Sequence, residues 1–387
     1  MKPLGTQPSR RQFIQQLGLS VTWLGLAYNT PLVFANSSAT LPFRQNATPL
    51  LLHWNENSLG MSPKALSAAK TAIERCGNRY PDASVDEFKV KLAGLHNVKP
   101  EQIIFGNGST EVLQAIATYA AQNNATMVEP SPTFGDLNGY CKAENLKVIQ
   151  VPVEQNFEMD IAALKKQAMA QTGAVLINIC NPNNPTGNIV DFTTLFDWIN
   201  NAPETHLFLL DEAYFDYAQA NARYKSGLAL INQGKDNVVI TRTFSKVHGM
   251  AGMRMGYGIA TEKTALKIKP FAAGFNLSAA ALAAASAALD DKPFYKKSIE
   301  YNQLSKTILV DTLNELELAH IPSDTNFVLH RIGKPLADYA RHMQQNGVRV
   351  GRKMTLDNHW NRISLGTPDE MMIFSRTLKA FRQEDWV

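Results

Sequence analysis

The stretch TRTFSKVHGMAGMRMGYG, residues 241–258, places Lys246 close behind two hydroxyl side chains and ahead of an arginine. Thr243 and Ser245 precede the lysine, glycines occupy positions 249, 252, 256 and 258, and Arg254 lies among them. An amine in such surroundings, near a cofactor, is placed to lose its proton and form a Schiff base. Arg254 is suited to bind a phosphate bidentately. The ordinary alternative is a lysine on a helix that faces solvent. The rest of the chain must decide between these two interpretations of Lys246.

Asp211 ends the apolar run HLFLLD, where an unpaired carboxylate is costly to desolvate. It therefore needs a cationic partner, and a protonated pyridine nitrogen would serve. Tyr214 follows three residues later and would reach the same ligand if the segment turns helically. A buried carboxylate and a nearby tyrosine thus add to the chemistry expected of Lys246.

The segment GNGSTEVLQAI places Gly108, Ser109 and Thr110 at the start of an expected helix. The first N–H groups of a helix have no internal partner, so a phosphate is well held there. A capped helix behind a tight turn is the alternative interpretation. The segment matches neither a GxxxxGK[ST] loop nor a GxGxxG motif with its acidic residue, which disfavours a nucleotide ligand.

Short apolar segments alternate with helical patterns and predict a mostly parallel sheet covered on both faces, an α/β fold. Ligands of such sheets bind beyond the carboxyl ends of the strands. The loops at those ends are rich in small, polar and ionisable residues: GNGST, PSPTFG, CNPNNPTGN, DEAY and FSK. The expected strands are 103–105, 126–129, 147–151, 174–179, 206–211, 238–243 and 257–260.

Helix signals frame this sheet. Ser62, Pro63 and Gly77 predict a helix between them. A capping box from Ser84 to Glu87 predicts that the next helix opens there. An Ala-rich helix from about 278, a long helix from 293 to about 318, and short strands near NFVLH and NRISL predict a second, smaller α+β domain. We expect the segment that precedes the helix at Ser62 to complete this smaller domain.

Composition excludes several classes of protein. With 387 residues, 45% hydrophobic and 19% charged, the chain is long enough for one large and one smaller globular domain. The net charge of +4 comes without a long basic run, so no nucleic acid partner is expected. Cys76, Cys141 and Cys180 are widely spaced and predict neither a disulfide framework nor a metal site.

The N-terminus has the pattern of an export signal. SRRQFIQ at 9–15 resembles the twin-arginine motif, and an apolar run extends to Ala35. Gly18, Gly25 and Pro31 interrupt the run and argue against a spanning helix. We expect residues 1–35 to be a signal peptide and the mature chain to be periplasmic after passing the export machinery. If the leader is not functional, the protein is cytoplasmic.

In order and spacing, NPNNPTG, DEAY and TFSK with a downstream arginine resemble the fold-type I, pyridoxal phosphate-dependent aminotransferases of class I/II. The resemblance covers the chain from about residue 48 to its end. HWNENSLG and NRYPD are most similar to the histidinol-phosphate aminotransferase branch. The resemblance implies an aspartate-aminotransferase-like fold. Its expected parts are an N-terminal segment at 36–59 that packs on the small domain, a large cofactor-binding domain at 60–280, and a small domain at 281–387.

The resemblance also implies roles for individual residues. Lys246 is similar to the lysine that forms the aldimine with pyridoxal 5′-phosphate, and Asp211 to the partner of the pyridine nitrogen. Asn184 and Tyr214 match the residues that bond the ring hydroxyl, and Phe134 matches the aromatic residue stacked on the ring. The implied phosphate site comprises Ser109, Gly108 or Thr110 beside it, Thr243 or Ser245, and Arg254.

Further implied roles concern the substrate and a second subunit. Tyr80 resembles the tyrosine that reaches the neighbouring subunit's phosphate site, which implies a homodimer with shared active sites. Arg362 matches the arginine that binds the substrate's acidic group, and Arg352 lies where a second such arginine is expected. Asn57 belongs to the segment that lines the substrate side.

The expected reaction moves an amino group from histidinol phosphate or a related donor to a 2-oxo acid such as 2-oxoglutarate. A periplasmic aromatic or other amino-acid aminotransferase is the main alternative, because an export signal fits poorly with histidine biosynthesis. A lyase or decarboxylase on the same scaffold also stays open. A non-catalytic regulator is disfavoured, because no helix-turn-helix segment is seen before residue 48.

Overall fold

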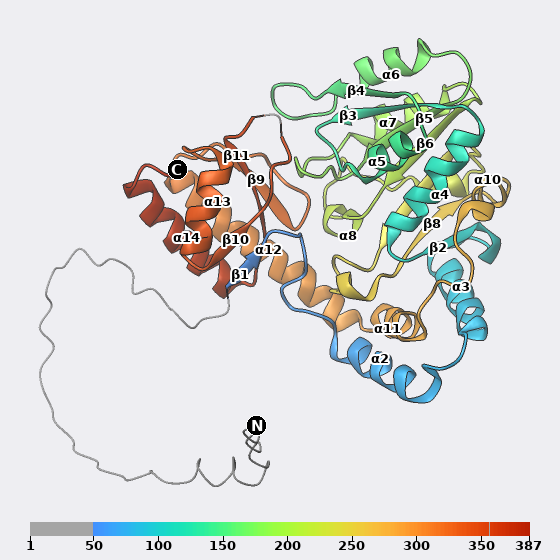
Figure 1. The fold of residues 1–387 in the computed structure, drawn as a ribbon, viewed down its shortest axis with the longest axis horizontal. Helices are drawn as coiled ribbons and strands as arrows, with labels where there is room; N and C mark the ends of the chain where they lie inside the picture. The colour runs from blue at the N-terminus through green and yellow to red at the C-terminus, as the bar shows by residue number, and fades with distance from the viewer. Residues whose placement is uncertain (1–48, 356) are drawn as a thin grey trace, which may run out of the picture. The chain divides into compact units, whose positions relative to one another are not determined.

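The computed structural model describes residues 49–355 and 357–387 (Figure 1). The predicted signal peptide, 1–35, lies outside these residues, as does most of the predicted segment 36–59. Among the helices of the described part, none is long and apolar enough to cross a membrane.

A seven-stranded sheet forms the centre of the larger part of the molecule, in the order β2-β8-β7-β6-β5-β3-β4. All seven predicted strands are present within a residue or two of their expected ends. The sheet is mostly parallel, and only β8 runs antiparallel to its neighbours β2 and β7. The strands are β2 (Ile103–Gly106), β3 (Thr126–Ser131), β4 (Val148–Pro152), β5 (Val175–Cys180), β6 (His206–Asp211), β7 (Val238–Thr243) and β8 (Gly256–Ala260).

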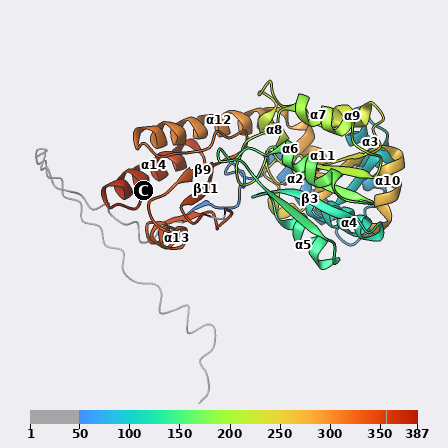
Figure 2. The same cartoon turned by 90° about the horizontal axis from the view of Figure 1, so that it is seen from above.

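Helices cover both faces of this sheet, which explains why its strands are nearly continuous apolar runs (Figures 1 and 2). Successive strand residues alternate between two hydrophobic clusters, as Leu209 and Leu210 do. One face packs on α4 (Ser109–Gln122), α5 (Asp136–Ala143) and α10 (Glu262–Ile268). The other packs on α3 (Asp82–His96), α6 (Ile161–Met169), α7 (Phe192–Asn200), α9 (Leu228–Asn232) and α11 (Ala279–Asp290), and α2 (Pro63–Cys76) packs on α11.

The signals for α2 are confirmed and those for α3 are corrected. The Ser62 side chain accepts a hydrogen bond from the backbone N–H of Ala65, and Pro63 opens α2. Helix α3 begins at Asp82, two residues before the predicted Ser84, and has no side-chain cap. The carbonyl of Pro81 already accepts from the backbone N–H of Val85 at 2.9 Å, so Ser84 lies within the first turn. The predicted capping box is therefore wrong.

The smaller unit has its own hydrophobic core, to which Leu52, Leu313 and Phe374 contribute. The long helix α12 (Lys292–Glu315) runs from beside α11 into this unit (Figure 1). It is joined by α13 (Leu336–Gln345), α14 (Pro368–Gln383) and the antiparallel pair β9 (Phe327–Arg331) and β11 (Trp360–Ser364).

The segment that follows the predicted leader contributes a strand to the smaller unit. Strand β1 (Leu50–Leu52) pairs in parallel with β10 (Val348–Val350). The expected smaller α+β domain is thus observed. The boundaries 36–59, 60–280 and 281–387 stay predictions.

Candidate active site

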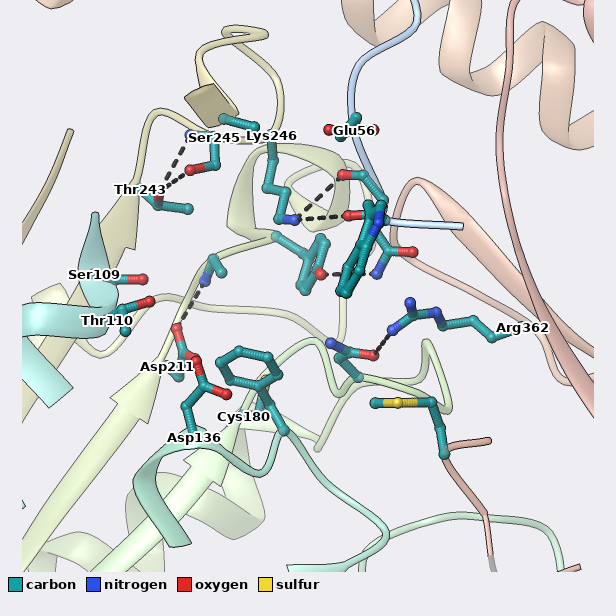
Figure 3. A pocket seen from close by; sticks show the side chains of 18 of the residues that line it. Glu56, Ser109, Thr110, Asp136, Cys180, Asp211, Thr243, Ser245, Lys246 and Arg362 are labelled. Carbon is teal, nitrogen blue, oxygen red and sulfur yellow. Dashed lines mark hydrogen bonds between the residues drawn. The ribbon is translucent and has the colours of Figure 1, made fainter. Parts of the chain in front are cut away.

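A cavity of about 500 Å³ opens beyond the carboxyl ends of the parallel strands, where the sequence predicted a ligand site. Its walls come from the loops after β2, β3, β5, β6 and β7 and from the segment after β1. Figure 3 shows hydroxyl side chains on one side, Arg362 on the opposite side, and Lys246 between them. The pocket thus joins residues from both parts of the fold.

One end of the pocket is suited to bind a phosphate. Ser109 and Thr110 occupy the start of α4, and Thr243 Oγ1 donates to Ser245 Oγ at 2.9 Å. Arg254 donates to Ser245 Oγ at 3.4 Å. Gly108 has a φ of +73°, and a Cβ there would overlap the Arg254 guanidinium. Helix N–H groups, hydroxyls and a guanidinium therefore converge as an anion cup.

Asp211 lies at the floor of the pocket with 4% of its surface exposed. The carboxylate accepts from Thr241 Oγ1 at 3.1 Å and from the N–H of Ala213 at 3.3 Å. Burial raises the pKa of Asp211 to about 6, although these two hydrogen bonds act in the opposite direction. A cationic ring nitrogen in the pocket would favour its charged form.

Lys246 follows β7 and extends into the pocket (Figure 3). Its Nζ donates to the backbone carbonyls of Asn55 at 3.3 Å and Trp54 at 3.4 Å. Burial, with a smaller effect from Arg362, lowers the pKa of Lys246 to about 8. The neutral amine, which is the nucleophile and the base, is therefore accessible near neutral pH.

Tyr214 and Asn184 lie near Lys246. Tyr214 is 3% exposed, its hydroxyl accepts from Asn55 Nδ2 at 2.9 Å, and Lys246 Nζ lies 5.4 Å from its ring centroid. Burial raises the pKa of Tyr214, so the hydroxyl keeps its proton and can donate it. Asn184 Oδ1 accepts from Arg362, which leaves its NH₂ group to donate. Phe134 also lines the pocket.

Two arginines line the side opposite the anion cup. Arg362 is 4% exposed and donates to Asn184 Oδ1 at 2.6 Å and to the carbonyl of His53 at 2.9 Å. Within the described residues its buried Nε has no hydrogen-bond partner. The guanidinium of Arg352 lies 5.2 Å from the ring centroid of Trp54.

Three residues named from the sequence, which are Gly108, Asn57 and Tyr80, lie outside the pocket lining. The Asn57 side chain donates to the carbonyl of Val247 at 2.8 Å and to Ser298 Oγ at 3.0 Å. It thereby fixes the N-terminal segment next to Lys246. Tyr80 is 75% exposed and meets Phe275 edge to face at 5.5 Å. The roles expected of Asn57 and Tyr80 stay predictions.

The structure adds residues that the sequence did not single out. Trp54, Asn55 and Glu56 line the pocket in place of Asn57, and Asp136 lines it from the start of α5. Thr241 bonds Asp211, its partner in the register of neighbouring parallel strands. That register was an available signal for Thr241, because adjacent strands were predicted. No comparable local signal points to Asn55 or Asp136.

Known proteins share both sequence and fold with the chain. Residues 47–377 match the family model of aminotransferase class I and II. A histidinol-phosphate aminotransferase of Moorella thermoacetica is 36% identical over 84% of this chain and 83% of its own length. The structure of a histidinol-phosphate aminotransferase from Sinorhizobium meliloti in complex with pyridoxal-5′-phosphate has a TM-score of 0.79 and 28% identity, covering 87% of this chain and 91% of that one.

A more distant structure bears on the fold alone. Aspartate aminotransferase from Thermotoga maritima has a TM-score of 0.74 at 18% identity, over 87% of this chain and 92% of that one. The expected aspartate-aminotransferase-like fold is confirmed.

Proposed function

Because the chain belongs to the class I and II aminotransferases, we propose that it transfers the amino group of histidinol phosphate or a related donor to a 2-oxo acid such as 2-oxoglutarate. The enzyme is a pyridoxal 5′-phosphate-dependent aminotransferase. The observation that carries the proposal is the placement of Lys246 in one pocket between an anion cup and a buried arginine.

The residues of the pocket fit this cofactor. The cup of Ser109, Thr243, Ser245 and Arg254 would hold its phosphate. Asp211, buried at the floor, would pair with the pyridine nitrogen. The bound cofactor supplies an electron sink for the charge left when the donor loses a proton.

Lys246 and Arg362 would act on the substrates. The Lys246 amine, with its lowered pKa, can take the proton from the donor's reacting carbon, a step worth about 10² to 10⁴ in rate. Its position against the Asn55 and Trp54 carbonyls holds it within the pocket. The Arg362 guanidinium, which lines the pocket, would bind the acceptor's carboxylate, so the same pocket serves both half-reactions.

Two observations support a donor that carries an anionic group. Arg352 and Arg362 both line the side away from the phosphate cup, and guanidinium groups bind phosphate and carboxylate alike. Two relatives that are 33% and 36% identical over 84% of the chain are named histidinol-phosphate aminotransferases. A periplasmic aromatic or other amino-acid aminotransferase is the second candidate, favoured by the leader pattern at residues 9–15.

Product analysis tests the proposal. The purified enzyme, loaded with pyridoxal 5′-phosphate, is given histidinol phosphate, phenylalanine or leucine with 2-oxoglutarate. We expect glutamate in amounts equal to the oxo product, fastest with histidinol phosphate. Carbon dioxide or an eliminated product in place of glutamate would show a decarboxylase or lyase instead.

We also propose a homodimer and export. Tyr80 and Phe275 form an exposed aromatic pair, and a partner subunit would cover them. Light scattering of the enzyme and of a Tyr80→Ser variant tests the dimer, which the variant should weaken.

N-terminal sequencing of the protein from the periplasmic fraction tests the leader, with a start near residue 36 expected.

A further inference from the structure

Asn55, in the turn after β1, forms hydrogen bonds through every polar group that it has. It is 1% exposed and adopts a left-handed φ of 55°. Its N–H donates to Ser364 Oγ at 2.8 Å, and that hydroxyl donates to Asn55 Oδ1 at 3.0 Å. Its Nδ2 donates to the Tyr214 hydroxyl, and its carbonyl accepts from Asn326 Nδ2, both at 2.9 Å. A residue so fully bonded has one defined orientation.

The bond from Asn55 to Tyr214 sets the direction in which the tyrosine donates. An oxygen that accepts from Asn55 keeps its own hydrogen for a different acceptor. Tyr214 lines the pocket, and burial raises its pKa, so the proton stays on the hydroxyl. The amide of Asn55 therefore aims the Tyr214 O–H at whatever occupies the pocket.

The carbonyl of Asn55 serves Lys246. It accepts from Lys246 Nζ at 3.3 Å, while Asn326 donates to the same oxygen. A lysine amine that is not covalently engaged thus has a fixed acceptor at the edge of the pocket.

Through Ser364, Asn55 is also tied to the substrate side. Ser364 ends β11, two residues after Arg362. Asn326 comes immediately before β9, the strand that pairs with β11. Asn55 therefore contacts three parts of the pocket: Tyr214, Lys246, and the strand that carries Arg362.

We propose that Asn55 is a positioning residue of this enzyme, which orients the Tyr214 hydroxyl toward the cofactor and receives the Lys246 amine. The inference rests on the proposed function in taking the pocket as the cofactor site. It requires only that the cofactor binds there, and it is independent of which amino donor reacts.

The left-handed backbone at Asn55 selects informative substitutions. Glycine and aspartate tolerate this conformation better than other residues do. Asn55→Gly removes the bond to Tyr214 and keeps the main-chain contacts. Asn55→Asp keeps the shape and the acceptor for Ser364, but its carboxylate would draw the Tyr214 proton away from the pocket. Asn97→Gly is a matched control, since Asn97 is exposed, left-handed at φ 54° and outside the pocket.

The experiment is a pH titration of the visible absorption band of the full-length holoenzyme without substrate. A cofactor oxygen that loses a hydrogen-bond donor holds the proton that it shares more tightly. The pH at the midpoint of the absorption change should therefore be higher in such a variant. For Asn55→Gly we expect a shift of about 0.5 to 1 pH unit, the size of one net hydrogen bond. Asn55→Asp should shift the midpoint at least as far, and Asn97→Gly should leave it unchanged.

A double substitution separates positioning from general loosening of the fold. In a Tyr214→Phe background, Asn55→Gly should produce no further shift, because the hydroxyl that it orients is gone. The charged and titratable groups facing Tyr214, which are Arg362, Asp211, Cys180 and Lys246, remain in every variant. If Asn55→Gly folds poorly, Asn55→Asp in both backgrounds gives the same test. An unchanged midpoint in folded variants, or additive shifts in the double variant, would overturn the proposal.

Failure of the positioning role of Asn55 is distinguishable from failure of the proposed function. If the wild-type holoenzyme produces no glutamate from any donor while the midpoint still moves with Asn55, the function fails and the positioning role stands. If glutamate forms and the midpoint does not respond to Asn55, the positioning role fails alone.

Discussion

The two sides of the pocket are built in different ways. On the phosphate side, the side chains follow directly after strands of one sheet, as Ser109 follows β2 and Ser245 follows β7. On the substrate side, contacts join parts of the chain that are far apart, such as Asn55 with Ser364 and Arg362 with Asn184. The sheet fixes the first side, and the packing of the smaller unit on the larger fixes the second. Changes on the phosphate side should therefore affect every substrate, and changes on the substrate side should discriminate among them.

Loss of the reactive amine should have the largest effect. Lys246→Ala removes both the attachment point and the base, so we expect both half-reactions to fall by about 10³-fold or more. Single-turnover absorbance with each substrate measures this loss. Lys263→Ala is the control, because Lys263 pairs with Asp236 at the surface. Substantial turnover by Lys246→Ala would refute its assignment.

Neutralising the carboxylate at the floor should come next. Asp211→Asn should lower kcat by about 10²-fold to 10³-fold for all donors, since it removes the buried charge that we propose pairs with the cofactor. Asp216 is a matched control: burial raises its pKa to about 6 as well, but Tyr295 donates to it at 2.9 Å outside the pocket. Equal losses in Asp211→Asn and Asp216→Asn would mean that both carboxylates serve stability alone.

The substrate arginine should separate substrates. Arg362→Lys loses the planar fork, so KM for 2-oxoglutarate should rise about 10-fold to 100-fold, the size of a charge-assisted hydrogen bond. The dissociation constant of the cofactor should change little, and equilibrium dialysis measures it. A variant that loses cofactor while its KM stays constant would place Arg362 on the wrong side of the pocket.

A single methyl group tests the phosphate cup. Gly108→Ala would displace the Arg254 guanidinium, so we expect cofactor binding to weaken roughly 10-fold, about 1.4 kcal/mol. Gly139→Ala adds the same group where no atom lies within 4 Å. Fluorescence titration with pyridoxal 5′-phosphate compares the two. Equal binding by both variants would contradict a cup at Gly108.

The smallest effect concerns pH. Because burial lowers the pKa of Lys246 to about 8, the neutral fraction of its amine should rise with pH and reach half near 8. An ordinary lysine would titrate near 10.4. The rate at which the cofactor-free enzyme takes up pyridoxal 5′-phosphate should therefore level off above pH 8 to 9. A rate that still climbs steeply at pH 10 would show an unperturbed lysine.

The same division explains how much could be predicted from the sequence. The seven strands and the cup residues follow from apolar runs and from what comes directly after them. The sequence analysis named Asn57, but its neighbours Asn55 and Glu56 line the pocket instead. The direction of each side chain in this turn depends on contacts with distant residues, such as that of Asn57 with Val247. The start of α3 was misjudged because the carbonyl of Pro81 begins the helix without a side-chain cap.

Transamination is tested most directly by the visible spectrum of the holoenzyme, titrated with histidinol phosphate alone and then with 2-oxoglutarate. We expect the donor to abolish the cofactor band with one oxo product formed per site, and the 2-oxo acid to restore the band with one glutamate. A band that persists with histidinol phosphate and with aromatic and aliphatic amino acids, or one that is lost without glutamate on adding the acceptor, would contradict transamination.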